Sequence, residues 1–404
     1  MMYMTDFLEK QFASFEELPF GVLDATALSQ IAMVHAKDTM APLPGKRPRA
    51  GLRTLFGRHD AQPPIHFIDM LRAEHFATMF ASLLDPDKAK EALFGVAASP
   101  RYRAMLALNY QDVFDASRQV QFAAMTFVYK DLFTCVSFRG TDTSRVGWRE
   151  DFNMAFTMPV PAQDLALQYL ESVAAQKHLP GPLYVVGHSK GGNLAEYAAL
   201  RCTPHIQERI AHVYNLDGPG FKAGTFTQTD YRPLASKLTK VVPEESLVGI
   251  MLDSDAPVHV AVSDATGLEQ HSAFTWQVND ELTDFVYLPG LPESTQVTAR
   301  TLHAWLSGYD DAEREKMVDA FFEAIEVSHA HNPVDFLRGG TKGLSLLLEA
   351  SRKLDKPDRD ILLSAARSFV KALSQNAHGT LGAAASAVTN IADRIAPHHL
   401  EQNE

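Results

Sequence analysis

Short apolar runs alternate with segments of helical spacing through the middle of the chain. The strand-like runs are bounded by turn-forming residues and lie at 119–129, 132–138, 183–186, 210–216, 247–252 and 257–263. Between them, apolar residues recur at helical spacing over 161–177 and 190–201. Only Lys130 and Asp131 separate the first two runs, so we expect a hairpin there. Strands alternating with helices predict an α/β protein with a mostly parallel sheet and helices on both faces.

Helical patterns also occupy the two ends of the chain. Residues 5–37 and 66–94 have helix-like spacing, and Asp24 is placed to cap a helix within the first of these segments. From about residue 291 onward the pattern is helical throughout, most clearly over 311–329 and 358–375.

We therefore expect a first domain over residues 1–290 and a helical C-terminal extension over 291–404. Nothing in the extension points to catalysis. Packing on the sheet domain is the simplest role for it, and self-association or recruitment of a partner are the alternatives.

Residues 42–64 differ in composition from the neighbouring segments, because they combine prolines and glycines with a basic cluster. The cluster consists of Lys46, Arg47, Arg49, Arg53 and Arg58. We interpret the segment as a solvated surface insertion. The alternative is a cover over the active site that meets anionic groups of a substrate.

Composition narrows the class of protein. The chain has 404 residues, a net charge of −12, 46% hydrophobic residues and 21% charged residues. These values are typical of a soluble globular protein, and the acidic balance argues against a nucleic-acid partner. Cys135 and Cys202 lack metal-ligand spacing and are expected to be reduced core residues. Neither a signal peptide nor an apolar stretch of transmembrane length is evident, so we expect a cytoplasmic enzyme.

Candidate chemistry centres on the turn Gly187-His188-Ser189-Lys190-Gly191. It lies between an apolar strand and a helix, which is the context of the nucleophile elbow of α/β-hydrolases. A serine that attacks an acyl carbon must project from a sharp turn, and the flanking glycines let the backbone approach it closely. A helix that starts directly behind the serine directs free N–H groups toward a developing oxyanion. Ser189 is therefore the predicted nucleophile, and a plain glycine-rich turn is the alternative.

Further motifs strengthen this prediction. Val136-Ser-Phe-Arg-Gly-Thr141, followed by Trp148 and Asp151 and then by the elbow, resembles the class 3 lipase pattern. The wider sequence is similar to a bacterial lipase-like family of uncharacterised function. The motifs that carry this similarity are Gly192, Asp217-Gly-Pro-Gly, Pro243-Glu-Glu-Ser-Leu-Val-Gly and Gln270-His-Ser-Ala-Phe-Thr-Trp276. The resemblance covers roughly residues 1–290 and implies an α/β-hydrolase fold and an acyl-ester hydrolase.

The oxyanion hole requires two donors. One is expected to be the backbone N–H of Lys190, directly after the nucleophile. The other is expected from Thr141, which resembles the lipase residue that donates a backbone N–H and a hydroxyl. A simple strand end with a turn glycine is the alternative for this segment.

The base must be a histidine that follows the serine, because α/β-hydrolases order the triad as serine, acid, histidine. His271 follows the last predicted strand, in a position from which a loop could overhang the elbow, and the family resemblance indicates the same residue. His259 lies within a predicted strand and is interpreted as a packing or surface residue.

The acid is the most open assignment. Asp217 closes the first strand after the nucleophile helix, and its turn resembles the one that carries the acid in pancreatic-type lipases. Class 3 lipases place the acid one strand later, where this chain offers Glu245, and Asp253 or Asp255 follow a further strand. We favour Asp217, with a turn-forming role as its competing explanation.

Together these residues predict a serine hydrolase that cleaves small-molecule or lipid esters through an acyl-enzyme, without a metal or an organic cofactor. The alternative is a catalytically inactive α/β-hydrolase fold that acts as a binding or scaffold protein. The sequence specifies neither the acyl chain nor the oligomeric state.

Overall fold

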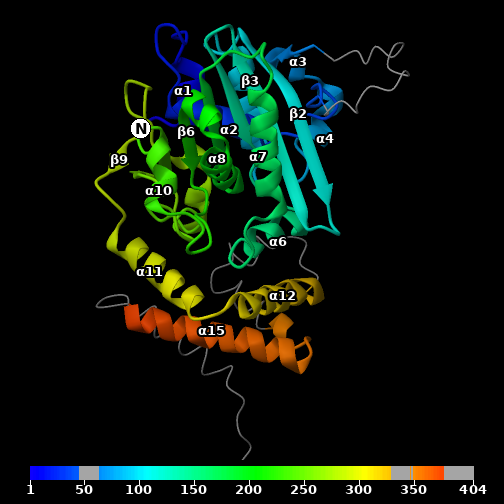
Figure 1. Cartoon of the computed structure of the whole chain (residues 1–404), viewed down its shortest axis with the longest axis vertical. Helices are drawn as coiled ribbons and strands as arrows, with labels where there is room; N and C mark the ends of the chain where they lie inside the picture. The colour runs from blue at the N-terminus through cyan, green and yellow to red at the C-terminus, as the bar shows by residue number, and fades with distance from the viewer. Residues whose placement is uncertain (45–62, 329–345, 347–348, 377–404) are drawn as a thin grey trace, which may run out of the picture. The chain divides into compact units, whose positions relative to one another are not determined.

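The structure is a computed structural model that describes residues 1–44, 63–328, 346 and 349–376. Its contacts divide the chain into two compact units (Figure 1). Unit 1 comprises residues 1–151 and 158–290, and unit 2 comprises 152–157 and 291–404. Most of the basic segment 42–64 lies outside the described residues.

Unit 1 is built on a mixed sheet of nine strands within the described residues, and spatial neighbours are also neighbours in sequence. The strands are β1 (Ile65–His66), β2 (Met105–Asp115), β3 (Val120–Tyr129), β4 (Phe133–Phe138), β5 (Leu183–His188), β6 (Ile210–Leu216), β7 (Leu238–Pro243), β8 (Val258–Ala261) and β9 (Tyr287–Leu288). Strands β4 to β8 are parallel, whereas β1 to β4 and the β8–β9 pair are antiparallel.

The expected mostly parallel sheet is therefore a parallel centre with antiparallel edges. The reason lies in the connections. β2, β3 and β4 follow one another through short turns, and a short turn can join only antiparallel neighbours. The β3–β4 pair is the predicted hairpin, with Lys130 in the left-handed region at φ 48°. β4, β5, β6 and β7 are joined by longer connections that contain helices, which allow parallel pairing.

Helices cover both faces of the sheet, as predicted. Along β5, Leu183 and Val185 belong to one apolar core while Tyr184 and Val186 belong to the other, as expected for side chains that alternate between faces. The first core includes α7 (Pro161–Ala174) and α8 (Lys190–Arg201), and α7 lies along β3 in Figure 1. The second contains α2 (Val22–Ile31), which packs on β4, β5 and β6.

The other helices before residue 290 belong to unit 1, except for the last two residues of α6, which belong to unit 2. They are α1 (Met4–Lys10), α3 (Phe67–Met70), η2 (Ala73–His75), α4 (Phe76–Met79), α5 (Pro86–Ala98), α6 (Arg145–Asn153), α9 (Pro204–Arg209), α10 (Gln228–Tyr231), η3 (Arg232–Leu234), η4 (Gly267–His271) and η5 (Ala273–Thr275). The helical pattern over 66–94 is thus divided among four helices. Asp24 is the third residue of α2 and accepts from Gly21 N, so it caps from inside the helix. Its carboxylate also binds the buried Arg101 guanidinium at 2.7 Å, which ties α2 to the segment after α5.

One strand assignment from the sequence was wrong, and four strands within the described residues were not predicted. These are β2 and β7, together with β1 and β9, which have two residues each and are too short to give a pattern. The apolar run 247–252 is not a strand but a turn, because Gly249 N donates to a side chain at 3.1 Å instead of to a neighbouring strand. β2 was not recognised because a bulge between Leu108 and Gln111 interrupts its alternation. β7 was missed because Lys240 lies at its centre and Pro243 at its end, and both residue types disfavour a strand assignment.

Unit 2 is helical over its described residues, with α11 (Glu293–Ser307), α12 (Asp311–Val327) and α15 (Lys356–Asn376). Trp305 on α11 donates from Nε1 to the Ser368 hydroxyl on α15 at 2.9 Å. Ala324 of α12 packs with Ala350 and Leu354 in a small core of its own. The predicted helices over 311–329 and 358–375 are thus confirmed to within two residues at each end.

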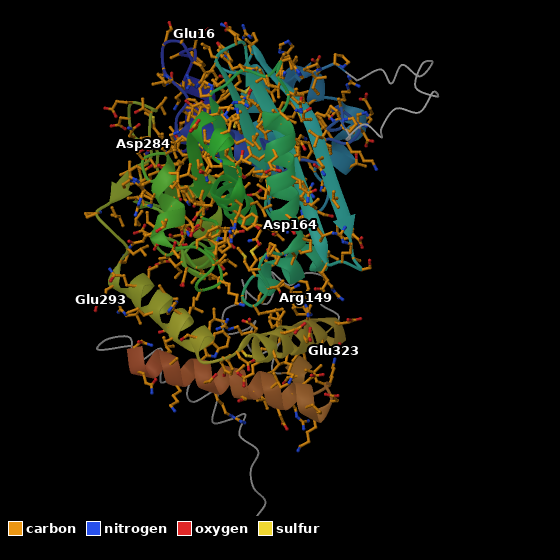
Figure 2. The ribbon with its side chains drawn as sticks, viewed as in Figure 1. Glu16, Arg149, Asp164, Asp284, Glu293 and Glu323 are labelled. Atoms are coloured by element: carbon orange, nitrogen blue, oxygen red, sulfur yellow. The ribbon has the colours of Figure 1, made fainter. Side chains whose placement is uncertain are left out.

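Charged side chains such as Glu16 and Asp164 lie on the outside of unit 1 (Figure 2). Cys135 and Cys202 are buried and are not in a disulfide. In the described part of the chain, no helix is both long and apolar enough to cross a membrane.

Candidate active site

Ser189 occupies the turn between the end of β5 and the start of α8. Its backbone has φ 59° and ψ −132°, a conformation that costs a non-glycine residue of order 1–3 kcal/mol and persists only where the surroundings impose it. The Ser189 N–H donates to the Leu216 carbonyl at 2.9 Å, which attaches the turn to the end of β6. The residue is partly exposed while the residues on either side are buried. This is the strained strand-to-helix geometry that the motif predicts.

The glycines around Ser189 are required by close backbone contacts. A Cβ on Gly187 would lie 2.1 Å from the Gly191 carbonyl oxygen, and one on Gly191 would lie 2.2 Å from the Phe138 carbonyl oxygen. A Cβ on Gly192 would lie 2.3 Å from Asn215 Oδ1. Real Cβ atoms do not approach other atoms this closely, so these positions admit only glycine in this backbone.

Asp217 lies directly after β6, next to the elbow. It is fully buried and has φ 49°, and its N–H donates to the Val241 carbonyl at 2.7 Å. The carboxylate accepts three hydrogen bonds: from His271 Nδ1 at 2.6 Å, from the Ser246 hydroxyl at 2.5 Å and from Gly249 N at 3.1 Å. These donors come from two segments, the turn that holds Ser246 and Gly249 and the loop that holds His271, and they fix the orientation of the carboxylate.

His271 ends η4, in the loop that follows β8. Its Nδ1 carries the hydrogen, because a carboxylate accepts, so the unprotonated Nε2 is available as a base. The His271 carbonyl accepts from His188 Nε2 at 2.7 Å, and the two rings lie 4.7 Å apart between centroids. Trp276, fully buried, donates from its indole N–H to the Gln270 carbonyl at 2.7 Å. These contacts fix the backbone on which His271 sits.

Ser189, His271 and Asp217 thus belong to one neighbourhood. His271 bonds to Asp217, and its ring packs at a tilt of 33° against that of His188, the residue before Ser189. The Ser189 N–H bonds to the carbonyl of the residue before Asp217. Within the described part of the chain no hydrogen bond joins the Ser189 hydroxyl to the His271 ring. Such bonds are often long without substrate and shorten in the reacting complex.

The alternative acids lie in other environments. Glu245 is exposed, and its carboxylate accepts from Gly267 N at 2.6 Å. Asp253 is exposed and exchanges backbone hydrogen bonds with Phe221. Asp255 is also exposed. Asp217 is the carboxylate that the structure brings to His271.

The two expected oxyanion donors come from two different segments beside Ser189. Lys190 is the first residue of α8, so its N–H has no carbonyl partner within the helix. Thr141 follows Gly140, on which a Cβ would lie 3.3 Å from Ser189 Cβ. The loop after β4 therefore runs beside the serine. The Thr141 hydroxyl donates to Asp151 Oδ2 at 2.6 Å, so it is the Thr141 N–H that remains for an oxyanion.

Two supporting residues were not singled out by the sequence analysis. His188 is buried, and burial together with the nearby His271 lowers its pKa to about 3, so it stays neutral and donates from Nε2. Ser246, which binds the Asp217 carboxylate, lies within the Pro243-Glu-Glu-Ser motif. That motif was visible in the sequence, but the contact it makes depends on how the chain folds.

The sequence of this chain matches the Mbeg1-like family over residues 96–323, which is more than half of the chain. The chain belongs to the Mbeg1-like family. This is a lipase-like family of uncharacterised function, in agreement with the resemblance seen in the sequence. No curated protein matches the chain. The match to the Mbeg1-like family includes Thr141, Ser189, Asp217 and His271.

Among the described residues there is no group of three or more histidine, cysteine, aspartate or glutamate side chains that could hold a metal ion.

Proposed function

We propose that this chain is a serine hydrolase that cleaves acyl esters through Ser189, His271 and Asp217. The observation that carries the proposal is the 2.6 Å contact between His271 Nδ1 and the buried Asp217 carboxylate, beside a serine with a strained backbone. A buried, triply hydrogen-bonded carboxylate that orients a histidine is the arrangement by which this class of enzyme holds its base. Membership of a lipase-like family points to the same reaction class.

In the proposed mechanism the Ser189 hydroxyl attacks the ester carbonyl while His271 Nε2 takes its proton. The negative charge on the tetrahedral oxygen is stabilised by the backbone N–H groups of Lys190 and Thr141. His271 then protonates the leaving alcohol, and an acyl-enzyme on Ser189 remains. A water molecule, deprotonated by His271, then attacks the acyl carbon, and the ring returns the proton to the Ser189 oxygen as the carboxylic acid leaves. Asp217 keeps the hydrogen on Nδ1 and stabilises the positive charge that the ring gains.

We assign an α/β-hydrolase fold and the catalytic groups to residues 1–290, and a helical extension without catalytic residues to 291–404. Small carboxylic esters, acylated metabolites and lipids are all admissible substrates. The reaction needs no cofactor, because each proton transfer is made by His271.

Covalent labelling by a fluorophosphonate probe tests the proposal, since the probe reacts only with an activated serine. We expect the wild type to be labelled and Ser189→Ala to remain unlabelled at the same protein concentration. A folded wild type that resists the probe and hydrolyses no member of an ester panel of increasing acyl length would favour the inactive binding or scaffold protein. The rates across that panel would separate a short-chain esterase from a lipase.

A further inference from the structure

The Lys190 side chain lies inside the protein instead of extending to solvent. Only 1% of it is exposed, although it begins a helix at the surface turn that carries Ser189. Its ammonium donates to the Gln121 carbonyl at 3.0 Å, to Gln121 Oε1 at 2.8 Å and to Glu150 Oε2 at 3.1 Å. It also lies 3.5 Å from Asp151 Oδ1. A buried ammonium is costly unless it is paired and hydrogen-bonded, and here it is both.

The contact with Asp151 links Lys190 to Thr141, the second expected donor of the oxyanion hole. Asp151 Oδ2 accepts from the Thr141 hydroxyl at 2.6 Å, while its Oδ1 faces the Lys190 ammonium. Within the described part of the chain Asp151 Oδ1 has no hydrogen-bond partner. The chain Lys190–Asp151–Thr141 therefore links the first residue of α8 to the loop after β4.

Glu150 holds the other end of the network in place. Its Oε2 accepts from Gln121 N at 3.0 Å as well as from Lys190, and its Oε1 accepts from Ala162 N at 2.8 Å. Glu150 is fully buried, so the network connects β3, α6 and the start of α7. Because Glu150 has backbone donors of its own, it keeps partners when Lys190 is replaced.

The charges explain why a cation is needed. Glu150 and Asp151 are adjacent carboxylates in a largely buried site, and the Lys190 ammonium contacts both. Burial raises the pKa of Asp151 to about 6, and the Lys190 charge opposes that rise. Without the ammonium, Asp151 would take up a proton at higher pH. A protonated carboxyl no longer acts only as an acceptor, so the Thr141 hydroxyl would lose its fixed orientation.

We propose that the Lys190 side chain is a positioning group for the oxyanion hole, which holds Asp151 and through it Thr141 in register with the Lys190 backbone N–H. One residue thereby supplies one oxyanion donor from its backbone and aligns the other through its side chain. This inference rests on the proposed hydrolase function. The Lys190 ammonium thereby has a role of its own, in addition to that of the Lys190 backbone N–H.

The test is a double-mutant cycle on the rate of fluorophosphonate labelling between pH 5 and pH 9. Lys190→Met keeps the backbone donor and most of the unbranched side chain but removes the ammonium and its charge. We expect a loss of labelling rate on the order of 10- to 100-fold, as for a misplaced reacting group. In the Asp151→Asn background the same substitution should cost less than about threefold, because the ammonium acts through Asp151.

The pH profile provides a second readout that a structural role would not change. Relative to Asp151→Asn, which has no carboxyl group to ionise, we expect the wild-type rate to rise as Asp151 ionises near pH 6, and this difference to move to higher pH in Lys190→Met. With an ester substrate, kcat should fall while KM stays close to the wild-type value. If Lys190→Met folds poorly, Lys190→Met combined with Glu150→Gln removes one charge of each sign, and the loss of rate should persist.

Arg101→Met is the matched control, because it removes another buried, ion-paired cation from the opposite side of the sheet. It should lower stability but leave the labelling rate of the folded fraction unchanged. Effects of Lys190→Met and Asp151→Asn that multiply, or an unshifted pH profile, would overturn the inference while the hydrolase function stands. A wild type that the probe does not label would remove the hydrolase function and this role together.

Discussion

Replacement of Asp217 by asparagine tests the central contact of the site. Asparagine has nearly the same shape, so its remaining oxygen can accept from Ser246 and Gly249 as before. Its amide group must then face His271 Nδ1, and an amide N–H requires an acceptor there. The ring hydrogen is thereby displaced to Nε2, where the base should be free. The variant keeps the packing and loses the correct tautomer.

The expected magnitude follows from these contacts. A tautomer error of this kind costs on the order of 10⁴-fold in kcat where it has been isolated in a serine hydrolase. We expect a loss of about 10³- to 10⁴-fold here, which corresponds to about 4–5 kcal/mol of transition-state stabilisation. Stability should fall less, by about 1–3 kcal/mol, because one charge-assisted hydrogen bond is lost.

The assay is the steady-state hydrolysis of a chromogenic short-chain ester, with thermal unfolding measured in parallel. Asp255→Asn is the matched control, because it makes the same chemical change at an exposed aspartate that is also a candidate acid, and it should retain wild-type kcat. The reasoning would be refuted by an Asp217→Asn protein that turns over at the wild-type rate. A large loss of rate in Asp255→Asn instead would move the acid to that residue.

Three further outcomes are expected. His271→Ala should abolish fluorophosphonate labelling while circular dichroism stays unchanged, and normal labelling would place the base elsewhere. Gly187→Ala should destabilise the fold by more than about 3 kcal/mol, because its Cβ would lie 2.1 Å from the Gly191 carbonyl oxygen, whereas Gly290→Ala, which meets no atom within 4 Å, should be neutral in chemical denaturation. His188 has a folded pKa of about 3, below its unfolded value, so the neutral ring makes the protein less stable as the pH falls from about 6.5 toward 3. In His188→Gln, which keeps a donor, the free energy of unfolding should therefore fall by roughly 2 kcal/mol less between pH 7.5 and pH 4.5 than in the wild type. The same fall in both proteins would contradict this.

Local sequence patterns predicted the secondary structure correctly where one physical preference dominates. The hairpin around Lys130 and Asp131, the strand 210–216 and the helix 190–201 were predicted at or near their observed limits, because turn residues and apolar periodicity agree there. The turn around Ser189 was also predictable. Contacts with neighbouring backbone require glycines at 187 and 191, so the spacing of these glycines indicates the geometry of the turn.

Local sequence patterns gave wrong predictions where a residue contacts partners that are distant in the sequence. The apolar run 247–252 resembles a strand, yet Gly249 N is needed by the Asp217 carboxylate, and the segment forms a turn. Lys240 interrupts β7 in sequence, but the sheet accommodates it in a buried position. A short run cannot reveal such contacts, because their partners lie tens of residues away along the chain.

By itself, the sequence determined the α/β class, the helical C-terminal region, the Ser189 turn and a short set of histidine and carboxylate candidates. Which carboxylate meets His271 was decided only by the tertiary structure, since Asp217 and His271 lie 54 positions apart and are joined by the order of parallel strands. The burial of the Lys190 ammonium against Glu150 was likewise decided there. A local pattern records the preferences of a segment, whereas the partner of a charge depends on which segments the sheet brings to the same edge.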